Sequence, residues 1–211
     1  MKKAILIVLI VITALLLAFG VYLLVDEEAR QRDLRNYPVA YADLIAANAE
    51  EFGLDPYLVL AVMRCESSFD PEAVSNRGAK GLMQIMPDTG SWIAHKLDLD
   101  DSYEESMLFD PAVNIRFGCW YLRFVGGRFD GNVKCMVAAY NAGHKTVENW
   151  LEDPAYGSGG TLLTIPYEST AAYYERVTTS LDRYRALYPT LFGEPGSPAE
   201  PAGTVAGNGE S

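Results

Sequence analysis

The hydrophobic and polar positions divide the chain into an apolar N-terminal run and a long series of helices. The run from Ala4 to Val25 contains no charged residue and is long enough to cross a bilayer. It follows two lysines, and it is longer than the apolar core of a cleavable signal peptide. We therefore predict an uncleaved single-pass anchor over residues 1–25, with the rest of the chain on the extracytoplasmic side of the cell membrane. Cleavage after residues 18–20 is the alternative.

A charged linker over residues 26–36 separates this anchor from a region in which apolar residues recur at helical spacing. Asp55-Pro56 and Asp110-Pro111 each combine a helix N-cap residue with proline at the first helical position. Further helices are predicted near Tyr41, Pro87, Asn132, Val147 and Thr170.

No segment of any length shows the alternation of a strand. The prediction is a mostly α-helical domain over residues 37–190, with at most a small hairpin in a glycine-rich loop. We expect Gly126-Gly127 to end the helix that begins at Asp110. The composition after residue 190 favours a disordered tail over residues 191–211.

Charge and cysteine content narrow the function classes. The net charge of −11 argues against nucleic-acid binding, which normally needs a basic face. The two histidines and three cysteines lack metal-ligand spacing, so we expect neither a metal nor a cofactor. Cys65 and Cys119 lie in apolar helical patterns that favour buried free thiols, while a Cys119–Cys135 disulfide remains open.

The helix that begins at Asp55 is apolar almost all round, which is typical of a buried helix. A single carboxylate, Glu66, lies at its far end. Because such a carboxylate is poorly solvated, its pKa should rise, and a raised carboxyl can act as a general acid near neutral pH. Gly78 and Gly81 follow in a loop, where glycine would allow the backbone to approach a ligand. The alternative is that Glu66 is simply a solvated helix end.

Three motifs in order resemble the soluble-type lytic transglycosylases of glycoside hydrolase family 23. They are Glu66-Ser67-Ser68-Phe69, then Ser75 with Gly78-Ala79-Lys80-Gly81-Leu82-Met83-Gln84-Ile85-Met86-Pro87, and Ala139-Tyr140-Asn141-Ala142-Gly143. The resemblance covers roughly residues 37–188. It implies a lysozyme-like helical fold behind the transmembrane helix.

The resemblance also implies an activity and a set of site residues. The family cuts the β-1,4 bond between MurNAc and GlcNAc in peptidoglycan glycan strands without water and leaves 1,6-anhydroMurNAc ends. Glu66 would be the single acid and then the base. The implied substrate-binding residues are Ser67, Ser68, Ser75, Met83, Gln84, Tyr140, Asn141 and Tyr173. The Tyr140 hydroxyl is expected near the catalytic carboxylate, and Leu82, Ile85 and Met86 are assigned to the core.

One departure from the family pattern concerns its last motif, which begins here at Pro166. The position that holds glutamate in the family holds Ser169 in this chain, and Glu168 lies one residue early. Either Glu168 reaches the cleft by a local shift, or the carboxylate is lost at this subsite. Ser169 is also a good N-cap residue for the last helix.

Two other functions remain open at this stage. A lysozyme-type muramidase would use water and should need a second carboxylate placed to activate it. A non-catalytic peptidoglycan-binding module would have no need of the acid. The sequence gives no indication of protein partners.

Overall fold

The helix that begins at Asp55 is the buried centre of the helical domain. The computed structural model describes residues 2–193, without the side chains of residues 2–4, 6, 8 and 10. Asp55 Oδ1 accepts a hydrogen bond from Tyr57 N at 2.9 Å, and Pro56 starts α3 (Pro56–Ser67). Every side chain from Leu58 to Met63 is buried. The predicted helix start and its burial are confirmed.

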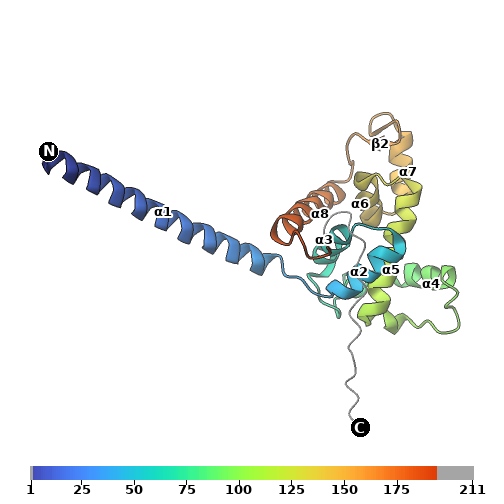
Figure 1. Ribbon diagram of the computed structural model, residues 1–211. Coiled ribbons are helices and arrows are strands. Elements are labelled where there is room, and N and C mark those ends of the chain that lie inside the picture. Colours follow the sequence, from blue (N-terminus) through green and yellow to red (C-terminus); the bar gives the residue numbers. More distant parts are fainter. Residues whose placement is uncertain (1, 194–211) are drawn as a thin grey trace, which may run out of the picture. The chain divides into compact units, whose positions relative to one another are not determined.

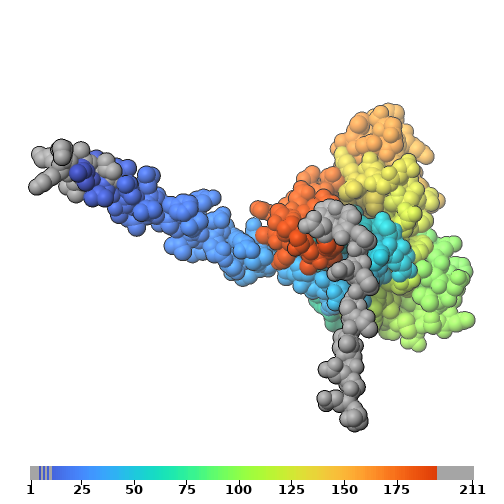
Figure 2. All heavy atoms as spheres, in the orientation of Figure 1, coloured from blue at the N-terminus to red at the C-terminus, as the bar shows by residue number. Residues whose placement is uncertain are grey.

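Two compact units divide the chain at Val39 and Ala40. The first unit is α1 (Lys2–Asn36), one continuous helix through both the predicted anchor and the predicted linker. Its described large apolar side chains are exposed from Ile5 to Val25 (Figure 2). Within the described residues, no helix reaches the combination of length and hydropathy that a bilayer span requires. The predicted membrane span is therefore not confirmed.

The second unit is built around α3 and α8 (Glu168–Leu187), which lie side by side (Figure 1). Helix α2 (Ala42–Phe52) packs on α5 (Pro111–Arg128). Helix α6 (Val133–Ala142) contacts α5, α7 (His144–Glu152) and α8. The core side chains on the helices around α3 include Ile45, Ile115, Leu122, Val137, Val177 and Tyr184.

Short elements complete the domain between these helices. Helix α4 (Pro87–Lys96) and the 3₁₀ helix η1 (Glu105–Phe109) both contact α5. Strands β1 (Gly157–Ser158) and β2 (Thr161–Leu162) form an antiparallel hairpin in which Gly157 lies opposite Leu162. A mostly helical domain with a small hairpin, as the sequence predicts, is confirmed.

Two predicted helix boundaries are wrong. Helix α5 continues through Gly126 and Gly127 to Arg128. Gly126 is buried beside Met136 of α6, where a Cβ would lie 3.3 Å from Met136 Cε, so this glycine serves close packing and does not end the helix. Helix α8 begins at Glu168 with Tyr167 as its N-cap, so Ser169 lies in the first turn and does not cap the helix.

Two further predictions concern the cysteines and the C-terminal segment. The three cysteines are free thiols, so Cys119 and Cys135 do not form a disulfide. In the predicted tail, Phe192 places its ring edge-on to Tyr57 of α3, with 5.0 Å between the ring centroids. The remainder of that tail, residues 194–211, lies outside the described residues.

Candidate active site

Glu66 lies one residue before the end of α3 and meets a tyrosine from the last helix. Its Oε1 accepts a hydrogen bond from the Tyr173 hydroxyl at 2.6 Å. Burial raises the pKa of Glu66 from 4.5 to about 7, while the Tyr173 hydrogen bond and the positive charge of Arg176 act in the opposite direction. The raised pKa agrees with the prediction from the apolar helix.

A carboxyl with this pKa holds its proton about half of the time at pH 7, so it can give up a proton and take one back. Burial and the charge of Glu66 raise the pKa of Tyr173 well above 10, so this hydroxyl stays protonated and donates. Tyr173 is only 2 % exposed. The structure therefore places it against the carboxyl group and not on the cleft surface, where a substrate-binding residue would lie.

The two serines after Glu66 hold the end of α3. The Ser67 hydroxyl donates to the carbonyl of Leu82 at 2.8 Å and so joins the helix end to the following loop. Ser68 ends the helix in the left-handed region, with φ of 54°, and its side chain is exposed. Neither serine belongs to the lining of the cleft described below, although the sequence assigned both to substrate binding.

The loop after α3 is fixed by a buried asparagine on α5. Asn114 is 0 % exposed; its Oδ1 accepts from Met83 N at 2.7 Å, and its Nδ2 donates to Lys80 O and Leu108 O. A Cβ on Gly81 would lie 2.2 Å from Leu108 O. The backbone at Gly81 therefore lies close to the backbone of Leu108, and not to a ligand as the sequence analysis expected.

Two predicted site residues shape the same loop. The Ser75 hydroxyl accepts a hydrogen bond from Ala79 N at 3.0 Å. Gln84 has a φ of 49°, and its Nε2 donates to Ala73 O at 3.1 Å and to Gly81 O at 2.9 Å. The amide of Gln84 thus stabilises the loop while its side chain also borders the cleft.

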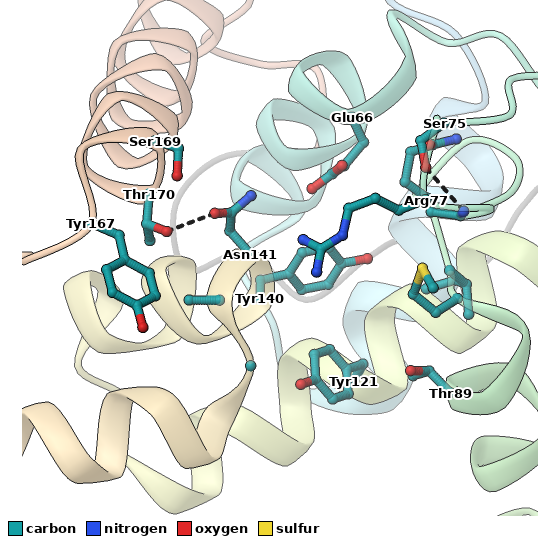
Figure 3. A pocket seen from close by; sticks show the side chains of 16 residues that line it. Glu66, Ser75, Arg77, Thr89, Tyr121, Tyr140, Asn141, Tyr167, Ser169 and Thr170 are labelled. Atoms are coloured by element: carbon teal, nitrogen blue, oxygen red, sulfur yellow. Dashed lines mark hydrogen bonds between the residues drawn. The ribbon is translucent and has the colours of Figure 1, made fainter.

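A cleft of about 450 Å³ opens in front of Glu66 (Figure 3). It brings together five of the predicted site residues, Glu66, Ser75, Gln84, Tyr140 and Asn141. The other lining residues are Arg77, Ala79, Ile85, Met86, Thr89, Tyr121, Ala142, Gly143, Tyr167, Ser169 and Thr170. Among the described residues that line this cleft, Glu66 is the only carboxylic acid.

The structure exchanges the predicted roles of two methionines. Met83 is 0 % exposed and fills the space above Gly118 of α5, where a Cβ would lie 2.2 Å from Met83 Sδ. Met86 is 40 % exposed and lines the cleft together with Ile85. The prediction that Met83 contacts substrate is not supported, because the missing side chain at Gly118 makes room for it in the core.

Tyr140 and Asn141 connect the end of α6 to its neighbours. The Tyr140 hydroxyl donates to the backbone carbonyl of Met83 at 2.8 Å, so its hydrogen bond is made to the loop and not to the carboxylate. Asn141 Oδ1 accepts from the Thr170 hydroxyl at 2.8 Å, which ties α6 to the first turn of α8 (Figure 3). Ser169 lines the cleft, whereas Glu168 is exposed and does not.

Several residues of the site escaped the sequence analysis. Asn114 could have been found, since a polar residue inside the apolar run of α5 needs buried partners. Arg77, Thr89 and Tyr121 have no comparable signal, because each reaches the cleft from a different element, whereas Tyr167 follows Pro166 in the last motif of the resemblance.

Comparison with known proteins identifies the family of this domain. The Transglycosylase SLT domain model matches residues 43–158, which is more than half of the chain. The chain belongs to this family. The soluble lytic murein transglycosylase of Salmonella typhimurium is 32% identical over 160 residues, covering 75% of this chain and 24% of that protein. Membrane-bound lytic murein transglycosylase C of Edwardsiella ictaluri is 36% identical over 159 residues, 70% of this chain and 44% of that protein.

Solved structures give the same family relationship. The 70 kDa soluble lytic transglycosylase from Escherichia coli superposes with a TM-score of 0.66 at 31% identity, covering 75% of this chain and 26% of that chain. A complex of the 70-kDa soluble lytic transglycosylase with bulgecin A gives a TM-score of 0.67 at 31% identity, covering 73% of this chain and 25% of that chain. This chain therefore spans about a quarter of the length of several relatives, and the shared part is the lysozyme-like SLT domain.

Proposed function

We propose that this SLT domain is a peptidoglycan lytic transglycosylase that cuts the β-1,4 bond between MurNAc and GlcNAc without water. The observation that carries the proposal is Glu66: a buried carboxyl with a pKa of about 7, held by Tyr173, as the only carboxylic acid among the described residues of the cleft. Family membership supports the same reaction.

The reaction needs one proton donor that later accepts a proton. Protonated Glu66 gives its proton to the glycosidic oxygen, the bond from this oxygen to C1 of MurNAc breaks, and the sugar passes through an oxocarbenium-like state. The Glu66 carboxylate then takes the proton of the C6 hydroxyl, whose oxygen closes on C1. The product is the 1,6-anhydro ring, and Glu66 regains its original proton.

The remaining cleft residues would hold the glycan strand. Ser75, Gln84, Tyr140 and Asn141 line the cleft, and hydroxyl and amide side chains suit the N-acetyl and hydroxyl groups of the sugars. We assign Ser67, Met83 and Tyr173 to positioning, since their side chains lie behind the cleft wall. Ser68 is assigned to ending α3.

A muramidase would release reducing ends by hydrolysis, and a second carboxylate near Glu66 would favour it. None lines the cleft among the described residues, which favours the transglycosylase. A binding module would have no use for a buried carboxyl of raised pKa, because keeping such a group ionised costs free energy.

The test is mass spectrometry of the soluble products that the full-length protein, in mild detergent, releases from purified peptidoglycan. Anhydro-muropeptides from the wild type, and none from Glu66→Gln, are expected. Reducing-end muropeptides would instead assign a muramidase. Retained binding to peptidoglycan without any product from the wild type would assign a binding module.

We also propose that α1 holds this domain at the cell membrane, with the domain on the extracytoplasmic side. The exposed apolar side chains between Ile5 and Val25 support membrane association, as do relatives named as membrane-bound lytic murein transglycosylases. Membranes washed with carbonate should retain the full chain and release a variant lacking residues 2–25. Protease added to spheroplasts should digest the domain. Recovery of the full chain in the soluble fraction would refute the proposal.

A further inference from the structure

The cleft contains a cation, Arg77, that has no ion-pair partner among the residues that the structure describes. Arg77 lies on the loop between Ser75 and Ala79 and extends into the cleft, where Figure 3 shows its guanidinium group between Glu66 and Tyr140 in projection. Among the residues that the structure describes, no carboxylate lies within ion-pair distance of Arg77. The positive charge that lowers the pKa of Glu66 is that of Arg176 on α8. Arg77 is not among the groups that shift this pKa.

The surroundings of Arg77 favour an anionic group. Besides Glu66, it is the only charged side chain among the described residues of the lining, and the opposite wall carries the hydroxyl of Ser169 (Figure 3). The N-terminal ends of α7, at Gly143, and of α8, at Tyr167, also border the cleft. Helix N-terminal ends add positive potential. On a chain with a net charge of −11, the cleft lining carries one arginine and one carboxyl and so has no excess of negative charge.

We propose that Arg77 binds a carboxylate of the substrate and thereby selects charged glycan strands. The inference rests on the proposed function, because peptidoglycan carries carboxylates beside the bond that is cut. They come from two sources: the lactyl group of MurNAc where the stem peptide has been removed, and the stem peptide where it is present. Guanidinium binds either one through paired N–H donors in a planar fork.

The experiment compares the wild type with Arg77→Gln and Arg77→Lys as full-length proteins in detergent. Arg123→Gln is the matched control, since Arg123 is exposed on α5 and does not belong to the cleft lining. The substrates are soluble glycan strands with intact stem peptides, strands stripped of peptides by an amidase, and intact strands whose carboxylates have been converted to amides. Anhydro products are counted to obtain KM and kcat.

Arg77→Gln should raise KM about fivefold on a charged substrate and leave kcat within about twofold, as expected for a charge-assisted contact of an exposed arginine. Arg77→Lys keeps the charge but loses the paired donors, so its KM should lie between those of the wild type and Arg77→Gln, while Arg123→Gln should stay near the wild type. An increase only with intact strands identifies the stem peptide as the source, and an increase only with stripped strands identifies the lactyl group. An increase with both assigns both carboxylates.

Two results overturn the inference while leaving the proposed function standing: equal KM values for the wild type and Arg77→Gln on both charged substrates, or the same increase on the amidated strands. If the wild type forms no anhydro product from any substrate, the proposed function itself fails. The two failures are therefore distinguishable.

Discussion

Replacing Glu66 by glutamine should stabilise the protein at neutral pH while abolishing its activity. The carboxyl is buried and its pKa is raised from 4.5 to about 7, so the folded state binds the proton more tightly than the unfolded state does. The stabilisation that comes from this proton is complete below pH 4.5 and is lost as the pH rises through 7. Glutamine has nothing to titrate, and its amide oxygen can still accept the Tyr173 hydroxyl.

The magnitude follows from the two pKa values. The difference between 4.5 and about 7 corresponds to about 3 kcal/mol of the free energy of unfolding, at about 1.4 kcal/mol per pKa unit. The stability advantage of Glu66→Gln over the wild type should therefore grow by about 3 kcal/mol between pH 4.5 and pH 8, with most of the change between pH 5 and 7.

Urea unfolding of the full-length protein in a nonionic detergent measures this difference. The three tryptophans, Trp92, Trp120 and Trp150, all lie in the catalytic domain, so their fluorescence reports its unfolding. Glu175→Gln is the matched control, because it removes one negative charge from an exposed position on α8. Parallel stability curves for the wild type and Glu66→Gln from pH 5 to pH 8 would refute the reasoning.

Three further substitutions test the surroundings of the site. Tyr173→Phe removes a hydrogen bond that favours ionised Glu66, so the alkaline limb of the pH profile of kcat/KM should move upward by about one pH unit, and an unmoved limb would contradict this role. Asn114→Ala removes the described partners of two buried backbone groups, Met83 N and Leu108 O, and should lower the free energy of unfolding by about 3 kcal/mol; a loss below about 1 kcal/mol in a urea titration would be inconsistent with it. Gly90→Ala places a Cβ 2.3 Å from the Tyr103 hydroxyl and should cost about 1–3 kcal/mol, and Tyr103→Phe, which removes a buried hydroxyl without a described partner, should restore most of it in a double-mutant cycle.

Much of the fold could be predicted because its signals are local. The starts of α3 and α5 follow from Asp55-Pro56 and Asp110-Pro111, where cap and proline are adjacent in sequence. The direction of the pKa shift of Glu66 was predictable for a similar reason, since the apolar pattern of the helix that carries it already indicates a buried setting. The continuation of α5 through Gly126 could not be predicted, because glycine is a common helix-end residue and the packing of Gly126 against Met136 joins two different helices.

The predictions for the site were weakest for side chains that could lie either in the core or on the cleft wall. Met83 and Met86 are three residues apart in one apolar run, and their difference is decided by Gly118, which lies on another helix. The hydrogen-bond partner of the Tyr140 hydroxyl could not be predicted either. It is the backbone carbonyl of Met83, in a loop that Asn114 of α5 holds in place. Such contacts join segments that are distant in sequence, so the spacing of residues within one segment does not predict them.

The hydrogen bond between Glu66 and Tyr173 joins residues 107 positions apart, and so links the first helix of the cleft to the last. Contacts of such long sequence separation form late, because the loop between them must close first. During synthesis, Glu66 leaves the ribosome long before Tyr173 exists. A nascent or truncated chain without α8 therefore has the acid but not its buried setting, and its carboxyl should ionise like an ordinary glutamate. If the proposed activity depends on this setting, this order of assembly couples its appearance to the completion of the whole domain.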